Sequence, residues 1–294
     1  MQVLYIAKHN SGGNDDEGAI THALQELGHE VITVSEGSGS DALGIDADLC
    51  LFHKWDDVAI LNQLKMPKAF WYFDLVDWDD SSLRARNRTR LRWMKNIIPH
   101  VDRGFCTDGD WINRYQEEAG GKLVRLSQGA DERFVGMRTG DERFDLLFTG
   151  ITRGGRERRR WVVDMANRYG KRFVHYQRGI YRGKLQKYIA QTTTCLGPSS
   201  PVTDRYWSNR VYMYLGFGAF MIHRHSEGLA EHYEIGKELI TYKTMDELCE
   251  KIDYYHAQPE ERKRVKVAAL ARTQGEHLYR HRCETLLEEM RATT

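Results

Sequence analysis

The stretch SNRVYMYLGFGAFMIH, residues 208–223, predicts a short helix that leads through a glycine turn into a buried strand. Ser208 is a favourable N-cap residue, and an apolar face follows at helical spacing, formed by Val211, Tyr212 and Leu215. Gly216 and Gly218 suit the end of a helix and a tight turn, and the apolar run at 219–222 is typical of a core strand.

The beginning of this helix is a candidate anion-binding site. Asn209 and Arg210 lie on its first turn, where backbone N–H groups have no partner within the helix. The positive end of the helix dipole points outward at the same place. The sequence therefore predicts that an anionic group of a ligand binds here.

The composition limits the class of protein. A chain of 294 residues with 41% hydrophobic residues is long enough for two domains with ordinary cores. Its 43 basic and 42 acidic residues give a net charge of +1, so overall charge predicts no partner by itself.

The cysteines and the N-terminus bear on the compartment. The five cysteines are far apart and form no CxxC pair, which argues against a disulfide framework or a zinc knuckle. The N-terminal segment MQVLYIAKHN has no cleavage region, and no apolar run approaches the roughly 20 residues of a membrane span. We therefore expect a soluble cytoplasmic protein without a membrane span, and the sequence leaves its oligomeric state open.

Two α/β units in tandem are predicted from the alternation of apolar and amphipathic segments. In the first half a helix is expected at 19–28, and strands are expected at 3–7, 29–35, 48–54, 68–76, 103–108 and 122–129. In the second half strands are expected at 145–151, 171–177, 192–197, 219–222 and 238–242. Helices are expected there near 156–168, 183–190, 244–257 and through most of 259–291. Apolar strands separated by helices favour parallel sheets that are covered on both faces.

A polar, glycine-containing segment separates the two units. We expect an N-terminal Rossmann-like domain at 1–135, a linker at 136–144, a C-terminal Rossmann-like domain at 145–275 and a final helix at 276–294. Ligands of doubly wound sheets bind beyond the carboxyl ends of the strands, near helix N-termini. The helix after Ser208 lies at such a position in the second unit.

Two further segments of the second unit suit an anion. FTGITRGGRERRR, residues 148–160, places a glycine turn and five arginines between a strand and a helix, and GPSS, residues 197–200, ends a strand with hydroxyl donors. We expect Arg153 and Arg156 to reach a diphosphate, and residues 158–160 to form a solvated helix face. The sequence lacks GxxxxGK[ST], GxGxxG and GxSxG, which argues against P-loop NTPases, nicotinamide-binding Rossmann proteins and α/β-hydrolases.

The second half resembles the nucleotide-sugar domain of GT-B glycosyltransferases. Residues 206–255 read YWSNRVYMYLGFGAFMIHRHSEGLAEHYEIGKELITYKTMDELCEKIDYY, a pattern similar to that of the CgeB-like group related to glycosyltransferase family 4. LLFTGITRGGRERRRWV resembles the strand, glycine turn and arginine-led helix that open such a domain, and LSQGADERF resembles the end of the preceding one. The resemblance is detailed over 145–290 and topological over 1–130.

The resemblance implies a GT-B fold, with two Rossmann-like domains facing each other across a cleft and the C-terminal helix packing back on the N-terminal domain. It implies transfer of a sugar from a nucleotide-diphosphate sugar to a hydroxyl group, with no cofactor besides this co-substrate. In that mechanism Arg153, Arg156 and Arg210 stabilise the departing diphosphate and no metal is required. The implied donor-binding residues are Gly150, Ser199, Ser208, Asn209, Glu227, Gly228, Leu229 and Glu231.

One position departs from the family pattern. Related enzymes often carry a glutamate three residues after this arginine, where it binds the ribose, and here the residue is Met213. A thioether cannot replace a bidentate hydrogen-bond acceptor. Ribose recognition is then expected at Glu227 or Glu231, and a nucleotide-sugar-binding protein without transferase activity remains an alternative.

The N-terminal unit is expected to bind the acceptor. Its first glycine-rich loop supplies His9, Gly12 and Gly13 as acceptor-binding candidates. Asp74 or Asp77 is expected to contact the acceptor hydroxyl, with Asp77 as the candidate catalytic carboxylate.

Three motifs suggest a metal but are better explained without one. The DWDD segment at 77–80 contains Asp-x-Asp, the metal motif of the other large glycosyltransferase fold, yet it follows a strand of a tandem α/β protein. The histidine pairs in HRH (223–225) and HLYRH (277–281) have no acidic or cysteine third ligand nearby. No metal site is therefore predicted.

The segment SSLRARNRTRLRWMK, residues 81–95, concentrates cations on the unit that should bind the acceptor. On a helix one side would carry Arg84, Arg88, Arg92 and Lys95. A solvated helix is one interpretation. Because the whole protein is charge-balanced, however, the cluster favours an anionic acceptor, and phosphate backbones are the commonest extended anions.

We expect a hydroxymethylated pyrimidine in DNA as the acceptor, with a surface, spore or small-molecule glycan as the alternative. Trp93 is expected to pack in the core rather than to stack on a base.

Overall fold

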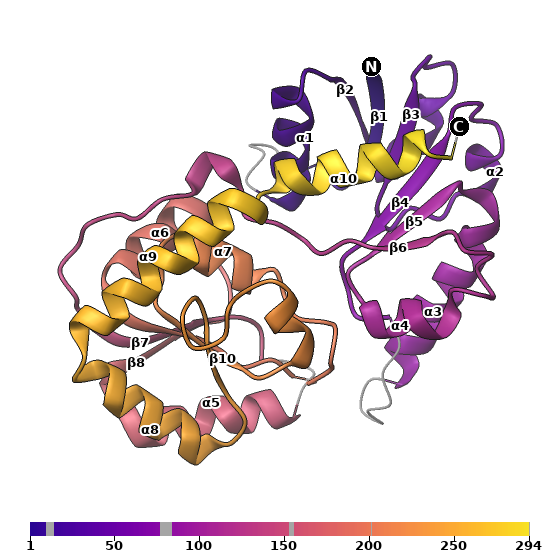
Figure 1. The fold of residues 1–294 in the computed structure, drawn as a ribbon. Helices are drawn as coiled ribbons and strands as arrows, with labels where there is room; N and C mark the ends of the chain where they lie inside the picture. The colour runs from indigo at the N-terminus through magenta and orange to yellow at the C-terminus, as the bar shows by residue number, and fades with distance from the viewer. Residues whose placement is uncertain (10–14, 77–83, 153–155, 201, 294) are drawn as a thin grey trace. The chain divides into compact units, whose positions relative to one another are not determined.

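The chain folds into two compact units (Figure 1). The structure, a computed structural model, describes residues 1–9, 15–76, 84–152, 156–200 and 202–293. One unit combines Met1–Gly129 with Tyr279–Thr294, and the other comprises Ala130–Leu278. The expected linker at 136–144 therefore lies within the second unit.

The first unit is built on a six-stranded parallel sheet with the order β2-β1-β3-β4-β5-β6. The strands are β1 (Gln2–Ala7), β2 (Glu30–Ser35), β3 (Leu49–Phe52), β4 (Lys68–Tyr72), β5 (Arg103–Cys106) and β6 (Leu123–Arg125). The helices are α1 (Asp16–Glu26), α2 (Val58–Leu61), α3 (Arg84–Ile97), α4 (Gly109–Tyr115) and α10 (Tyr279–Arg291), with short 3-10 turns η1 (Glu36–Ala42) and η2 (Ile98–His100).

Both faces of this sheet are buried because successive side chains of a strand point to opposite sides. Val3 and Tyr5 of β1 belong to a core that includes buried residues of α1 and α10. Leu4 and Ile6 belong to a second core, on the other face, with residues of α3 and α4. Helix α10 thus completes the first unit, although it comes from the end of the chain.

The second unit is built on a five-stranded parallel sheet with the order β11-β10-β9-β7-β8. The strands are β7 (Phe144–Thr149), β8 (Phe173–Tyr176), β9 (Thr192–Gly197), β10 (Met221–Arg224) and β11 (Ile240–Tyr242). The helices are α5 (Arg156–Tyr169), α6 (Arg182–Ala190), α7 (Arg210–Gly216), α8 (Met245–His256) and α9 (Pro259–Glu276), and the 3-10 turns are η3 (Glu132–Phe134), η4 (Gly170–Arg172) and η5 (Glu227–Glu231).

The helices of the second unit again cover both faces of their sheet. Leu146 and Phe148 share a core with α5 and α8. Leu147, between them, faces a core with α6, α7 and α9. Two parallel, doubly covered sheets confirm the predicted α/β class.

The segment 208–223 forms α7, a turn and β10, as predicted. Gly218 has a φ of +75°, which favours glycine, and a Cβ at Gly216 would lie 2.9 Å from the Ala130 Cβ. The prediction that the Ser208 side chain caps the helix is wrong. Its hydroxyl oxygen instead accepts a hydrogen bond of 2.9 Å from the Arg210 guanidinium.

The predicted helix at 259–291 is divided in two. Helix α9 ends at Glu276, and the carbonyl of His277 accepts a hydrogen bond of 2.8 Å from the Ala130 N–H. Helix α10 begins at Tyr279, whose ring packs against Trp71 in the first unit at 6.0 Å.

Within the part of the chain that the structure describes, no helix is both long and apolar enough to cross a membrane.

Candidate functional site

Arg210, the first residue of α7, lies at the carboxyl end of β7. Its Nε donates a hydrogen bond of 2.6 Å to the carbonyl of Thr149, and its Nη1 donates to the Ser208 hydroxyl. The guanidinium lies over the Phe148 ring, 5.1 Å from the ring centre. Burial lowers the pKa of Arg210, and these partners carry no negative charge. The side chain is thus held in one orientation by neutral groups.

Gly150 makes this orientation of Arg210 possible. A Cβ at Gly150 would lie 2.7 Å from Nη2 of Arg210 and 2.8 Å from the Phe148 ring. Any larger residue would displace the guanidinium. The packing around Arg210 therefore explains the glycine that follows β7.

Arg158, in the first turns of α5, is a second half-buried guanidinium near Arg210. Its Nη2 donates a hydrogen bond of 3.0 Å to the carbonyl of Ser200, and its Nη1 donates one of 3.3 Å to the carbonyl of Ile151. Its Nε is buried and has no hydrogen-bond partner in the part of the chain that the structure describes. Burial, together with the positive charge of Arg210, lowers the pKa of Arg158 to about 10. The expectation that Arg158 belongs to a solvated face is wrong, whereas Arg159 is exposed.

The two arginines have no counterion among the described residues. No carboxylate of the described residues lies within ion-pair distance of Arg158 or Arg210. The neighbouring Glu157 instead pairs with Arg224 and accepts a hydrogen bond from Ser200. Two adjacent, partly desolvated cations without a carboxylate are costly unless an anion joins them. The arrangement suits a ligand with two or more negative oxygens, such as a diphosphate.

Ser199 and His223 form a buried pair beside this site. Nδ1 of His223 donates a hydrogen bond of 2.6 Å to the carbonyl of Arg224, so its Nε2 accepts from the Ser199 hydroxyl at 3.1 Å. Burial lowers the pKa of His223 to about 3, and Arg210 and Arg158 contribute to this shift. The backbone N–H of Ser199 donates to the carbonyl of Gly197. Both donors of Ser199 are thus used within the protein.

The remaining donor-binding candidates lie around η5. Leu229 is fully buried in the core, and the Gly228 N–H donates to the carbonyl of Asp204 at 2.8 Å. The side chain of Glu227 is 73% exposed and contacts His225 at 3.1 Å. Glu231 lies 3.5 Å from Arg205. Glu227 therefore contacts a histidine and Glu231 an arginine, and the carboxylate of Glu227 is the more exposed of the two.

Met213 and Asn209 lie on or next to α7. Met213 packs, partly buried, against the core of the second unit. Asn209 occupies the N-cap position of α7 but makes no side-chain capping hydrogen bond.

Several predicted residues cannot be placed. Arg153, Asp77, Gly12 and Gly13 lie outside the described residues, as does the DWDD segment. Arg156 and Arg84 begin helices α5 and α3, but the positions of their side chains are not described.

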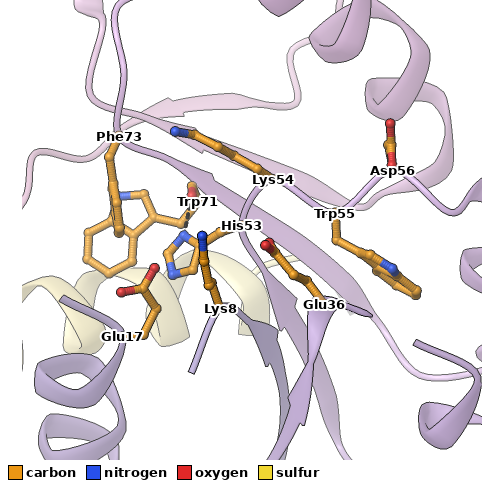
Figure 2. Close-up of a pocket in the computed structure, with 9 residues that line it drawn as sticks. All are labelled: Lys8, Glu17, Glu36, His53, Lys54, Trp55, Asp56, Trp71 and Phe73. Atoms are coloured by element: carbon orange, nitrogen blue, oxygen red, sulfur yellow. Dashed lines mark hydrogen bonds between the residues drawn. The ribbon is translucent and has the colours of Figure 1, made fainter. Parts of the chain in front are cut away.

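The first unit contains a cavity of about 500 Å³ at the carboxyl ends of β1, β3 and β4 (Figure 2). Among the residues that line it are Lys8, Glu17, Glu36, His53, Trp71 and Phe73. Figure 2 shows the Glu17 carboxylate and the Lys8 amine pointing toward the His53 ring. Aromatic rings and groups of both charges thus surround one space, which is typical of a binding pocket for a polar molecule with a ring.

His53 is a fixed part of the wall of this cavity. Its Nδ1 donates a hydrogen bond of 2.6 Å to the carbonyl of Trp71, and its Nε2 bonds the Tyr5 hydroxyl. Burial lowers the pKa of His53 to about 4, so the ring is neutral at pH 7. Both ring nitrogens are occupied within the protein.

The two acceptor-binding candidates that the structure describes near this edge are engaged elsewhere. Nε2 of His9 lies 3.0 Å from the carbonyl oxygen of Tyr5, in the preceding strand β1. Asp74 forms ion pairs with Lys54 and with Arg90, the latter at 2.9 Å. Neither His9 nor Asp74 lines the cavity.

Glu17, in the first turn of α1, was not anticipated from the sequence. Burial raises the pKa of its carboxyl group to about 7, and the nearby acids Asp16, Asp15 and Glu36 add to the shift. Among the described residues, no side chain forms a hydrogen bond or ion pair with this carboxylate. An acid directly after a glycine-rich loop was the available signal, but burial by the fold determines its ionisation.

The raised pKa of Glu17 predicts a pH-dependent difference in stability between the wild type and Glu17→Gln. The folded protein holds a proton on Glu17 that the unfolded chain releases near its lower, ordinary pKa. Stability contributed by this proton is therefore present at low pH and lost as the pH rises through about 7. Urea unfolding should show equal stability for the two proteins at pH 4 and a more stable variant at pH 8. A constant difference across this range would contradict the shift.

Helix α3 carries the basic segment of the first unit. Arg88 and Arg92 are exposed, and Lys95 pairs with Glu118 at 2.8 Å. Trp93 packs against Phe70 and Tyr72, which confirms that it belongs to the core. The side of α3 with Arg88 and Arg92 is thus available to a ligand.

Comparisons with known proteins agree with this architecture. The model of the glycosyl transferase-like family matches residues 141–288. Sucrose-phosphate synthase from Thermosynechococcus elongatus is structurally similar with a TM-score of 0.70, at 13% identity over 100% of both chains. Anabaena HepE in complex with UDP and glucose has a TM-score of 0.65, at 12% identity over 99% of this chain and 100% of its own.

A third similar structure is an alpha-glucosyltransferase in complex with UDP and a 13-mer DNA containing a central A:G mismatch. Its TM-score is 0.64, at 9% identity over 99% of both chains. No curated protein matches the sequence. The CgeB-like subgroup stays a prediction. Since the family model covers half of the chain and the whole chain has this fold, the protein belongs to the glycosyl transferase-like family and is a GT-B protein.

Proposed function

We propose that the protein transfers a sugar from a UDP-sugar to a hydroxyl group, with the donor bound in the second unit. The observation that carries this proposal is the pair Arg158 and Arg210 at the end of β7, two half-buried guanidiniums that have no carboxylate partner among the described residues. A diphosphate would neutralise both. UDP is bound in the similar structures of HepE and alpha-glucosyltransferase, which supports a uridine nucleotide.

The same pair would assist the reaction. When the bond between the sugar and the diphosphate breaks, negative charge develops on the leaving phosphate. Oriented guanidiniums in a partly desolvated site stabilise that charge without rearranging. Arg153 and Arg156, on the adjoining segment, are proposed to add to this charge, and Glu227 or Glu231 to contact the ribose.

For the acceptor we propose a hydroxymethylated pyrimidine in DNA, bound by the first unit. Arg88 and Arg92 are exposed on α3, where phosphates can reach them. The alpha-glucosyltransferase bound to DNA supports this choice. A base within a duplex would have to be flipped out before its hydroxymethyl group could react.

The experiment that tests the function measures sugar transfer from labelled UDP-glucose. The acceptors are a duplex with 5-hydroxymethylcytosine, the matched cytosine duplex, and a panel of oligosaccharides. Transfer to the hydroxymethylated duplex alone is expected. Transfer to a glycan would support the proposed transferase activity but would replace DNA with a glycan as the acceptor. UDP-glucose binding without transfer or hydrolysis would identify a non-catalytic binding protein.

The proposal includes a cytoplasmic location, because unpaired buried cysteines suit a reducing compartment.

Activity is expected to persist in excess EDTA. Arginines rather than a divalent cation are proposed to meet the charge of the leaving diphosphate, so removing Mg²⁺ and Mn²⁺ should change kcat by less than about twofold. Initial rates with EDTA, with Mg²⁺ and with Mn²⁺ check this. A loss in EDTA that Mn²⁺ restores would contradict it and would return the DWDD segment to consideration as a metal site.

A further inference from the structure

The cavity of the first unit contains a carboxylate that the proposed donor chemistry does not use. Glu17 extends from the first turn of α1 into this space, beside His53 and Lys8 (Figure 2). None of the described side chains forms a hydrogen bond or ion pair with its carboxyl group. Its oxygens are therefore available to a molecule in the cavity.

Three other polar side chains near this edge of the sheet, those of His53, His9 and Asp74, are occupied by partners within the protein. Both ring nitrogens of His53 are bonded within the protein, His9 is directed at the carbonyl of Tyr5, and Asp74 is paired with two cations. Two other carboxylates, Glu36 and Asp56, also line the cavity, and Asp56 is exposed. Glu17 lies beside the aromatic wall, where Phe73 packs against His53 at a ring distance of 4.4 Å.

We propose that Glu17 accepts a hydrogen bond from the acceptor hydroxyl, while Phe73 contacts the ring that carries it. The acceptor is therefore an alcohol attached to a flat or apolar ring face, either a nucleobase or a sugar. This inference rests on the proposed glycosyl transfer and adds to it a residue that orients the acceptor.

Ionisation of Glu17 would then control acceptor affinity. The charged groups around it are Lys8 after β1, the N-cap residue Asp15 and the first residue Asp16 of α1, Glu36 on η1, and Lys54 and Asp56 after β3. The hydroxyl of Tyr5 and the neutral ring of His53 lie nearby. Burial, together with the charges of Asp16, Asp15 and Glu36, raises the carboxyl pKa to about 7. Only the ionised form offers all its lone pairs, so acceptor binding should strengthen between pH 6 and pH 8.

The test compares Glu17→Gln with the wild type, using 5-hydroxymethyl-2′-deoxycytidine and glucose as acceptor probes and UDP as the donor-site probe. At pH 8 the variant should bind the preferred acceptor about 10- to 100-fold more weakly, the usual loss of a hydrogen bond to a charged group. At pH 6 the difference should shrink to about 2- to 10-fold, because only about a tenth of the wild-type carboxyl is then ionised. The Kd for UDP should be unchanged.

Two further variants make the result specific. Glu26→Gln makes the same chemical change on the exposed side of α1 and should leave acceptor binding unaltered. Phe73→Ala should weaken the same probe by about 5- to 100-fold, since stacking on a base or ring is lost. Preference for the nucleoside over glucose identifies the ring as a base, and the reverse preference identifies a sugar.

The outcomes separate the two proposals. Direct binding of the probes needs no turnover, so it tests Glu17 even if no sugar is transferred. Either of two results overturns the role of Glu17. In the first, Glu17→Gln binds the acceptor as tightly as the wild type at pH 8. In the second, Glu36→Gln by itself weakens acceptor binding as much as Glu17→Gln does. A wild type that binds neither UDP nor UDP-glucose overturns the proposed function instead.

Discussion

Arg210→Ala is expected to lower kcat by about 10²- to 10³-fold, the usual loss when one oriented donor to a developing charge is removed. Arg210 is fixed by the Thr149 carbonyl and the Ser208 hydroxyl and lies over Phe148, so its guanidinium is already oriented before the charge develops. Binding of UDP should weaken by about 10- to 100-fold, since a charge-assisted hydrogen bond is lost. Initial rates and titration calorimetry measure both effects.

Arg158 and Arg159 provide a matched pair of controls for this prediction. The two arginines are neighbours on α5, but Arg158 is directed inward toward Ser200 and Arg159 is exposed. Arg158→Ala should weaken UDP binding, and Arg159→Ala should not. Arg210→Lys tests the guanidinium itself, because a lysine keeps the charge but not the planar fork. A folded Arg210→Ala protein with wild-type kcat and UDP affinity would remove Arg210 from the site.

The double charge reversal Arg88→Glu with Arg92→Glu is expected to weaken binding of a hydroxymethylated duplex by about 10- to 100-fold at 0.1 M salt. Both side chains are exposed on α3, and each phosphate contact contributes about 0.9 to the slope of log affinity against log salt. The slope should therefore become shallower by about 1.8. Fluorescence anisotropy between 50 and 300 mM salt, a range of about sixfold, gives both the affinity for the duplex and the slope of log affinity against log salt.

The control for this reversal changes two cations on the second unit. Lys184→Glu with Lys187→Glu alters the net charge of the protein equally, and both lysines are exposed on α6. This control should keep most of the affinity and the slope. If both double variants lose the same affinity, the effect is one of net charge, and α3 is a solvated helix. Unchanged transfer to 5-hydroxymethyl-2′-deoxycytidine would show that the α3 variant is folded.

Much of the fold could be predicted because local patterns and tertiary contacts agree. Most strands contain a short run of apolar or β-branched residues, and β9, TTTCLG, coincides with the predicted segment 192–197. Parallel strands are usually buried on both faces, so such runs stand out from the amphipathic helices between them. Gly216 and Gly218 marked the end of α7 because a side chain at 216 would collide with Ala130, and the positive φ of residue 218 favours glycine.

The interruption between α9 and α10 was less predictable. Residues 259–291 have one continuous helical composition, but the chain leaves the helix after Glu276. There the His277 carbonyl pairs with Ala130, and Tyr279 packs against Trp71 in the first unit. Both contacts join residues more than 140 positions apart, so no local signal could reveal them.

The sequence by itself determined two α/β units, the glycines around Arg210 and a cationic segment on α3. It could not show which of the arginines at 158–160 faces the candidate site, because adjacent helix residues differ only in the direction in which their side chains leave the helix axis. The packing of α5 on β7 sets that direction. It could not identify Glu17 either, since a pKa is raised by desolvation, and desolvation depends on the strands and helices that enclose the side chain. Only the tertiary structure therefore decided which charged residues are exposed to solvent and which are held, partly desolvated, where a ligand can reach them.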